Sequence, residues 1–158
     1  VYLRFGRLAL PVFHDEATFK FEIGKGEQLT EGSDVAIIAT GLEVNEALIA
    51  AEQLKNEGIQ ARVINLCTIK PLDVDLILNS VSRTGRVLLV QEAVKTGGFM
   101  AEVSATIAES AVFGDLQAPI RRLCGLDTPI PYSPKLERAS VPQVEDIVAA
   151  ATALVGEW

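Results

Sequence analysis

The stretch that most constrains the fold runs from Arg86 to Phe99 and reads RVLLVQEAVKTGGF. Four apolar residues, 87–90, are followed by the polar pair Gln91 and Glu92 and then by a Thr-Gly-Gly turn. A short apolar run that ends in this way is typical of a strand at the centre of a parallel sheet. The next loop leaves the sheet at its carboxyl edge, where open α/β folds usually place function. The residues we expect at a functional edge are Glu92, Thr96, Gly97 and Gly98.

Strand and helix patterns alternate on both sides of this stretch. Strands are predicted over 34–40, 60–66 and 119–124, with a short edge strand within 26–29, and helices over 43–57, 71–83 and about 98–111. A Pro-rich connection over 125–137 then leads to a last helix. The pattern predicts a three-layer α/β/α sandwich around a mostly parallel sheet of about five strands, with one antiparallel edge strand as an option.

Several details of the helices can be specified in advance. Asp73 and Asp75 are interpreted as charges at a helix start, which favour the positive end of the helix dipole. Ser140 and Gln143 are expected to form a capping box for the last helix, with Pro142 in its first turn. The helix over 98–111 is expected to turn four residues inward: Phe99, Val103, Ile107 and Ala111.

The chain divides into three segments. Residues 1–13 (VYLRFGRLALPVF) resemble the end of a preceding domain, residues 14–32 are a polar, glycine-punctuated linker, and residues 33–158 form the main domain. The opening VYLRFGR lacks both an initiator methionine and a signal-peptide pattern. We therefore expect the chain to be part of a longer protein.

Composition narrows the possible partners. The formal net charge of −7 argues against nucleic acid or anionic lipid, because both require a basic surface. No apolar run approaches the roughly 18–20 residues of a membrane span. The chain has a single histidine, His14, which argues against a histidine-based metal site or a Ser-His catalytic triad. Cys67 and Cys124 are predicted to be buried, reduced thiols of a cytoplasmic protein, with a disulfide or metal pair as the alternative.

Glycine turns and charged residues each allow a functional and a structural interpretation. Gly41 and the Gly97-Gly98 pair could bind phosphate at helix starts, but neither common phosphate-binding motif is present. Glu92 is a candidate general acid or base, or instead a buried carboxylate that accepts N–H groups of the glycine turn. Arg121 and Arg122 point to opposite faces of a strand and favour an ion pair over a ligand contact.

Arg4 and Arg7 flank a glycine in the first segment. Two guanidinium groups at this spacing can bind a phosphate or carboxylate in a bidentate manner. We therefore treat Arg4 and Arg7 as candidate substrate-binding residues. The residues alone otherwise indicate an accessory domain without a complete active site.

Residues 32–73 and the later segments RTGRVLLVQEAVKTGGFMAEVSATIAES, APIRRLCGLDTPIPYSPKLE and VPQVEDIVAAATALV resemble one family over about 24–155. This is the C-terminal domain shared by transketolases and the E1 β subunits of 2-oxoacid dehydrogenases. VYLRFGRLALPVF is more similar to transketolases, whereas the TGGF loop and the PIPYSP crossing are more similar to E1 β subunits.

The resemblance implies an enzyme dependent on thiamin diphosphate and Mg²⁺, both held by other domains, so that none is expected on this chain. It implies a domain that supports dimer or α2β2 assembly and borders the active-site entrance, possibly with an acyltransferase (E2) partner near Trp158. It also implies that Arg7 contacts a sugar phosphate if the enzyme is a transketolase. The implied location is the cytoplasm, or the mitochondrial matrix or plastid in a eukaryote.

Three functions follow from these observations. The first is the assembly domain of an E1 β subunit acting on a 2-oxoacid or acetoin, inactive alone. The second is the same domain of a split transketolase. The third is a free-standing regulatory module that binds a small anion at Gly41 and Gly97-Gly98.

Overall fold

The computed structural model describes residues 1–6, 9–15, 17 and 19–156. Its centre is a five-stranded sheet in the order β1-β3-β2-β4-β5. The strands are β1 (Glu27–Gln28), β2 (Val35–Ala39), β3 (Ala61–Asn65), β4 (Val87–Val94) and β5 (Arg121–Gly125). The pairs β2–β3, β2–β4 and β4–β5 are parallel, and β1 pairs antiparallel with β3 at the edge. The predicted sheet, including its antiparallel edge strand, is confirmed.

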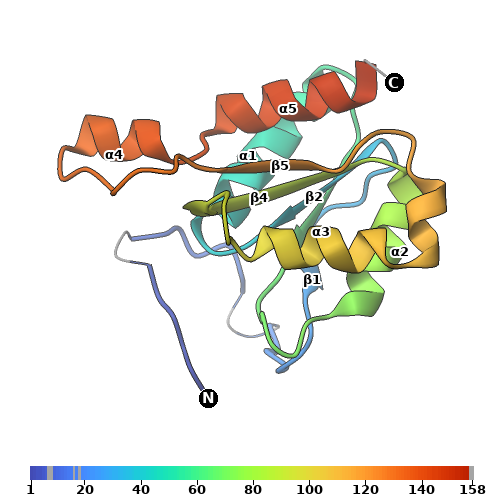
Figure 1. Ribbon diagram of the computed structural model, residues 1–158, viewed down its shortest axis with the longest axis horizontal. Coiled ribbons are helices and arrows are strands. Elements are labelled where there is room, and N and C mark those ends of the chain that lie inside the picture. The colour runs from blue at the N-terminus through green and yellow to red at the C-terminus, as the bar shows by residue number, and fades with distance from the viewer. Residues whose placement is uncertain (7–8, 16, 18, 157–158) are drawn as a thin grey trace.

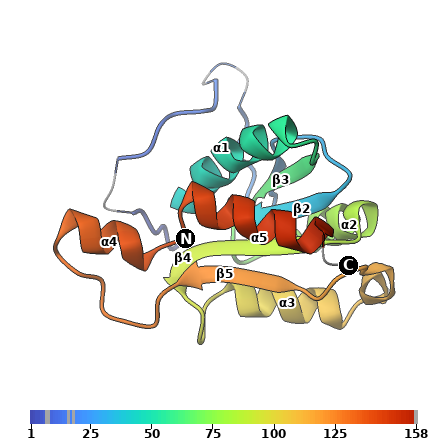
Figure 2. The same ribbon diagram turned by 90° about the horizontal axis from the view of Figure 1, so that it is seen from above.

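Helices cover both faces of the sheet (Figures 1 and 2). Helices α1 (Leu42–Asn56) and α5 (Val144–Gly156) cover one face, and α2 (Val74–Thr84) and α3 (Met100–Ala108) cover the other. The sheet supplies alternate residues to the two cores, so that Ile37 packs toward α1 and α5 while Ile38 packs toward α2 and α3. This arrangement is the predicted three-layer sandwich.

The strand after Arg86 differs from its prediction in two ways. β2, and not β4, is the middle strand, although β4 still has a partner on each side. β4 also continues past Val90 to Val94, and its register with β5 shifts between Gln91 and Val94. The polar residues Gln91 and Glu92 therefore belong to the strand, because pairing with β5 continues beyond the apolar run.

Helix boundaries show where local signals were misread. The Pro-rich connection contains a helix, α4 (Pro134–Ser140), which starts at Ser133-Pro134, a favourable N-cap and first-turn pair. The helix predicted over 98–111 ends at Ala108, and a 3₁₀ helix, η1 (Ala111–Asp115), follows it. Ala111 is exposed, so its predicted burial is wrong.

The capping box predicted from Ser140 and Gln143 is also wrong. Ser140 ends α4, and its hydroxyl donates to the carbonyl of Glu137 at 2.7 Å. At the start of α5, the Gln143 N–H instead donates to the Asp146 carboxylate at 3.0 Å. Pro142 precedes the helix rather than lying in its first turn. Asp73 does cap α2, because its carboxylate accepts from the Leu76 N–H at 3.2 Å.

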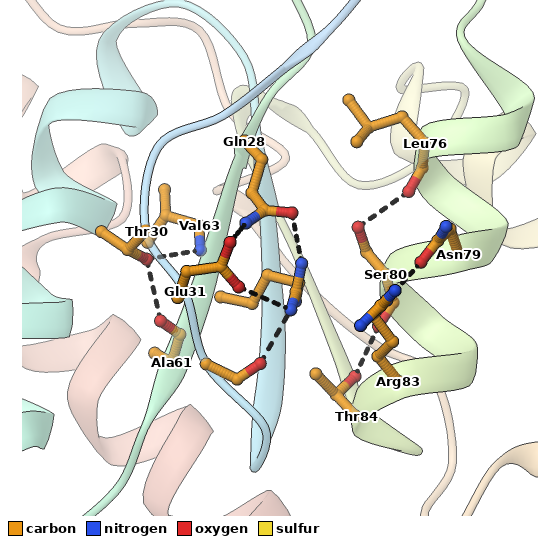
Figure 3. A network of polar contacts seen from close by, with 12 residues as sticks. Gln28, Thr30, Glu31, Ala61, Val63, Leu76, Asn79, Ser80, Arg83 and Thr84 are labelled. Atoms are coloured by element: carbon orange, nitrogen blue, oxygen red, sulfur yellow. Dashed lines mark hydrogen bonds and ion pairs between the residues drawn. The ribbon is translucent and has the colours of Figure 1, made fainter.

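The linker is held to the sheet edge by polar contacts (Figure 3). The Thr30 hydroxyl accepts from the Val63 N–H at 2.9 Å and donates to the Ala61 carbonyl at 2.8 Å. Arg62, only 7% exposed, donates to Gln28, to Glu31 and to the Gly32 carbonyl. These bonds satisfy a buried guanidinium and close the edge of the sheet beside β1.

The first segment, residues 1–13, lacks regular secondary structure where it is described. Its residues Val1, Tyr2 and Phe5 are exposed. No helix in the described ranges is long and apolar enough to cross a membrane.

Replacing Ile147 with alanine should lower the free energy of unfolding by about 2–5 kcal/mol, because its fully buried side chain would leave a cavity between α5 and the sheet. The matched control is Ile49→Ala in α1, where the isoleucine is 44% exposed and a loss below about 1 kcal/mol is expected. Urea unfolding followed by circular dichroism measures both. Equal losses in the two variants would contradict this packing of α5.

Candidate functional site

A cavity of about 350 Å³ opens at the carboxyl edge of the sheet. It lies between the first segment, the start of α1, the end of β4 and the crossing before α4. Its lining residues are Gly6, Leu10, Gly41, Leu42, Glu92, Ile130, Pro131, Tyr132 and Glu137. This is the edge at which the sequence placed a functional site, and a concave site of this kind is where small molecules usually bind.

Glu92 is the predicted site residue that reaches this cavity. Its half-buried side chain lines the wall, and its backbone lies on β4. Thr96, Gly97 and Gly98 follow on the turn after β4, at the same edge, but they do not line the cavity. The structure thus brings Glu92 to the cavity and leaves the functional roles of all four residues as predictions.

The turn after β4 is held by Gln91, a role that the sequence analysis did not assign to it. The buried Gln91 amide donates to the Val94 carbonyl at 2.9 Å, and its side-chain oxygen accepts the Met100 N–H at 2.8 Å. The alternative interpretation, in which Glu92 binds this turn as a buried carboxylate, is therefore wrong. Because Gln91 already uses the first N–H of α3, the turn is a poor site for an anion.

Gly97 and Gly98 are required for different reasons. Gly97 has a φ of +71°, a left-handed conformation that side chains disfavour. Gly98 lies so close to Gln91 that an added Cβ would be 1.9 Å from its Nε2 atom and 2.3 Å from the Val94 oxygen. The glycine pair therefore allows Gln91 to reach across the turn.

The predicted arginine and tryptophan sites are less well defined. Arg7 and Trp158 lie outside the described residues. Arg4 is exposed on the first segment, and Gly6, two residues later, lines the cavity. Arg121 is exposed, and Arg122 donates to the Lys95 carbonyl at 3.1 Å. Among the described residues, neither arginine forms the ion pair that the sequence favoured.

Glu43 is the site residue that the sequence analysis missed. It lies in the first turn of α1, is 0% exposed, and both carboxylate oxygens lack a hydrogen-bond partner among the described residues. Burial raises the pKa of Glu43 to about 8, and the nearby carboxylates of Glu46, Glu92 and Asp146 act in the same direction. The sequence offered one signal that Glu43 is buried: it lies four residues before the core residue Ala47, and residues at this spacing share one face of a helix.

The two cysteines are free, as predicted, but they are half-buried rather than fully buried. Cys124 lies on β5 near Glu43, and Cys67 lines a second cavity of about 170 Å³ beside the linker. Burial raises the pKa of both thiols. Neither is therefore activated as a nucleophile at neutral pH.

The described residues do not fit thiamin diphosphate and Mg²⁺. They contain no group of three or more histidine, cysteine or acidic side chains that could hold a metal ion. Within the described part of the chain, the cavity at the carboxyl edge is instead lined by two acidic side chains, Glu92 and Glu137, and by no basic one that would attract a diphosphate. We derive no catalytic step through the cofactor on these residues.

The fold and this edge define an α/β domain with a cavity at the carboxyl ends of its strands. Residues 24–147 match the family model of the transketolase C-terminal domain. The chain belongs to this family.

Relatives in the family include β subunits of dehydrogenases. The chain is 44% identical over 136 residues to pyruvate dehydrogenase E1 component subunit beta-1 of Arabidopsis thaliana, covering 86% of this chain and 37% of that protein. It is 46% identical over 129 residues to the 2-oxoisovalerate dehydrogenase subunit beta of Bacillus subtilis, covering 81% and 39%. The chain thus spans about two-fifths of the length of these relatives.

Solved structures of transketolases share the fold. A split-gene transketolase, described as an inactive β4 tetramer, superposes with a TM-score of 0.81 at 30% identity, covering 94% of this chain and 47% of that one. A mutant transketolase from Pichia stipitis superposes with a TM-score of 0.61 at 20% identity, covering 85% and 18%. The second likeness concerns the fold alone.

Replacing Gly98 with valine should lower the free energy of unfolding by about 2–4 kcal/mol, because the side chain would displace Gln91 and leave buried polar groups without partners. Gly114→Val is the matched control, since nothing lies within 4 Å of an added Cβ there. Thermal and urea unfolding measure both variants. A Gly98 variant as stable as the control would refute the close approach of Gln91 to this turn.

Proposed function

We propose that this chain serves as the C-terminal domain of a thiamin-diphosphate-dependent enzyme of the E1 β type, which acts on a 2-oxoacid or on acetoin. The observation that carries the proposal is its 40–46% identity, over most of its length, to β subunits of pyruvate, 2-oxoisovalerate and acetoin-oxidising enzymes. Full-length enzymes of this family depend on thiamin diphosphate. The domain supports assembly and borders the active-site entrance, and it is not catalytic by itself.

Exposed apolar residues around α4 support a role in assembly. Leu126, Ile130 and Tyr132 lie on the crossing before α4, Leu136 lies on the helix, and all four are more than half exposed. Figures 1 and 2 show α4 extending beyond the end of the sheet. An exposed apolar surface of this kind suits contact with another domain or subunit.

The proposed partners are those of an E1 β subunit. E1 β subunits pair with α subunits in heterotetramers, and we propose that this chain contributes to such an α2β2 assembly or to a homodimer. An acyltransferase (E2) core is proposed to dock near the end of α5, at Trp158. We propose that other domains of the assembly hold Mg²⁺ and thiamin diphosphate. The proposed location of the assembly is the cytoplasm or, in a eukaryote, the mitochondrial matrix or a plastid.

A split transketolase is the second candidate. It is favoured by the TM-score of 0.81 to a split-gene transketolase. In this case Arg7, with Arg4, contacts a sugar phosphate at the cavity that Gly6 and Leu10 border. The third function, a free-standing anion-binding module, is disfavoured because acidic residues occupy the carboxyl edge and Gln91 holds the N–H of Met100.

Titration of the chain with thiamin diphosphate and Mg²⁺ should give no binding heat and no thermal shift, because the described residues offer neither metal ligands nor a diphosphate site. Isothermal calorimetry measures the heat, and scanning calorimetry measures the shift. Saturable binding would overturn the assignment of an accessory domain.

The subunit-binding domain of an acyltransferase should be retained by the immobilised chain if it is of the E1 β type, and Trp158→Ala should weaken this retention at least tenfold. Leu136→Ala on α4 is the control, because α4 and the end of α5 lie at opposite ends of the molecule (Figures 1 and 2). Biolayer interferometry measures both. No retention by the native chain would leave the split transketolase as the better candidate.

A further inference from the structure

Glu43 is a buried acid that no part of the proposed assembly function explains. It lies where the start of α1 meets the ends of β4 and β5 and the start of α5, and it is 0% exposed. Neither of its carboxylate oxygens has a hydrogen-bond partner among the described residues. An ionised carboxylate in such a position is strongly disfavoured, whereas its neutral form can pack there.

The groups around Glu43 add to this cost instead of relieving it. Glu46 acts on it from α1, Glu92 from β4 and Asp146 from α5, and all three are acidic. On β5 the neighbouring group is the thiol of Cys124. Two cations, Arg122 and Lys95, act on Cys124, and the Arg122 guanidinium donates to the Lys95 carbonyl.

One interaction does favour the charged form. Glu43 lies in the first turn of α1, where the positive end of the helix dipole stabilises a negative charge. This stabilisation falls off within one turn and is small beside the cost of burying a charge without a hydrogen bond. The balance therefore favours a neutral Glu43 in the folded chain near pH 7.

We propose that Glu43 is a proton-controlled lock, whose neutral carboxyl allows α1, α5 and the ends of β4 and β5 to close around it and whose ionisation loosens this edge of the sheet. The lock acts on the cavity because Glu92, which lines the cavity wall, is one of the charges that act on Glu43. It is a property of the domain itself and does not depend on which enzyme the domain serves.

The direction of the pH effect follows from the two states of the chain. The carboxyl of Glu43 has an ordinary pKa of 4.5, and the folded environment raises this pKa to about 8. The folded chain therefore holds one more proton than the unfolded chain between these values, and its stability falls as pH rises through this range. The stabilisation is fully present below pH 4.5 and is lost once pH exceeds about 8.

The experiment compares urea unfolding of the full chain between about pH 5.5 and 9.5 with that of three variants. Glu43→Gln keeps the shape of the side chain and removes its charge. Glu43→Met also removes the polar atoms, so this variant can fold even if the unpaired amide of Glu43→Gln prevents folding. Glu52→Gln is the matched control, because Glu52 is exposed on the same helix.

The folding equilibrium constant of the native chain should fall by up to about tenfold per pH unit relative to both Glu43 variants, as expected for one linked proton. The Glu52 variant should keep the pH dependence of the native chain. The Glu43 side-chain carbon, followed by NMR, should titrate near pH 8 together with the backbone amides of Cys124 and Ile147. Parallel pH profiles in the native chain and both Glu43 variants, or titration near pH 4.5, would overturn the proposal.

Discussion

The structure depends on the burial of parallel strands on both faces. Every residue of β2 is 0% exposed, and its neighbours β3 and β4 contribute to the same two cores. Parallel strands cannot be joined by tight hairpins, so each connection crosses a face of the sheet as a helix and covers it. The carboxyl edge is then the place where the chain can present polar groups together, and the cavity lies there.

At this edge, polar side chains form hydrogen bonds with backbone groups at the ends of strands and helices, where regular backbone partners are missing. Gln91 joins the end of β4 to the start of α3, and Asp146 accepts the N–H that precedes α5. The Gln91 bond lets β4 and α3 meet without an unpaired buried N–H group, and the Asp146 bond caps the start of α5. Glu43 is the exception, because nearby carboxylates act on it and its oxygens lack partners within the described part of the chain.

Much of the fold and part of the site could be predicted from local sequence. The apolar run before Gln91, the stripe of α1 and the Asp73 cap each depend on residues close together in the chain, and all were found in the predicted elements. Glu92 was placed at the carboxyl edge for the same reason. The misread details are α4, which starts at Ser133-Pro134, and the start of α5, because Ser140 ends α4 instead of capping α5.

The sequence by itself determined the strands and the helices that cover the sheet, and hence the layered architecture, because apolar periodicity acts over a few residues. The tertiary structure alone decided that β2 occupies the middle of the sheet, that Gln91 closes the glycine turn, and that the charges of Glu92 and Asp146 act on Glu43. These features join residues distant in the chain. Their energies depend on burial and on interactions between charges that come close only when the strands and helices pack. A local sequence pattern contains no information on such contacts.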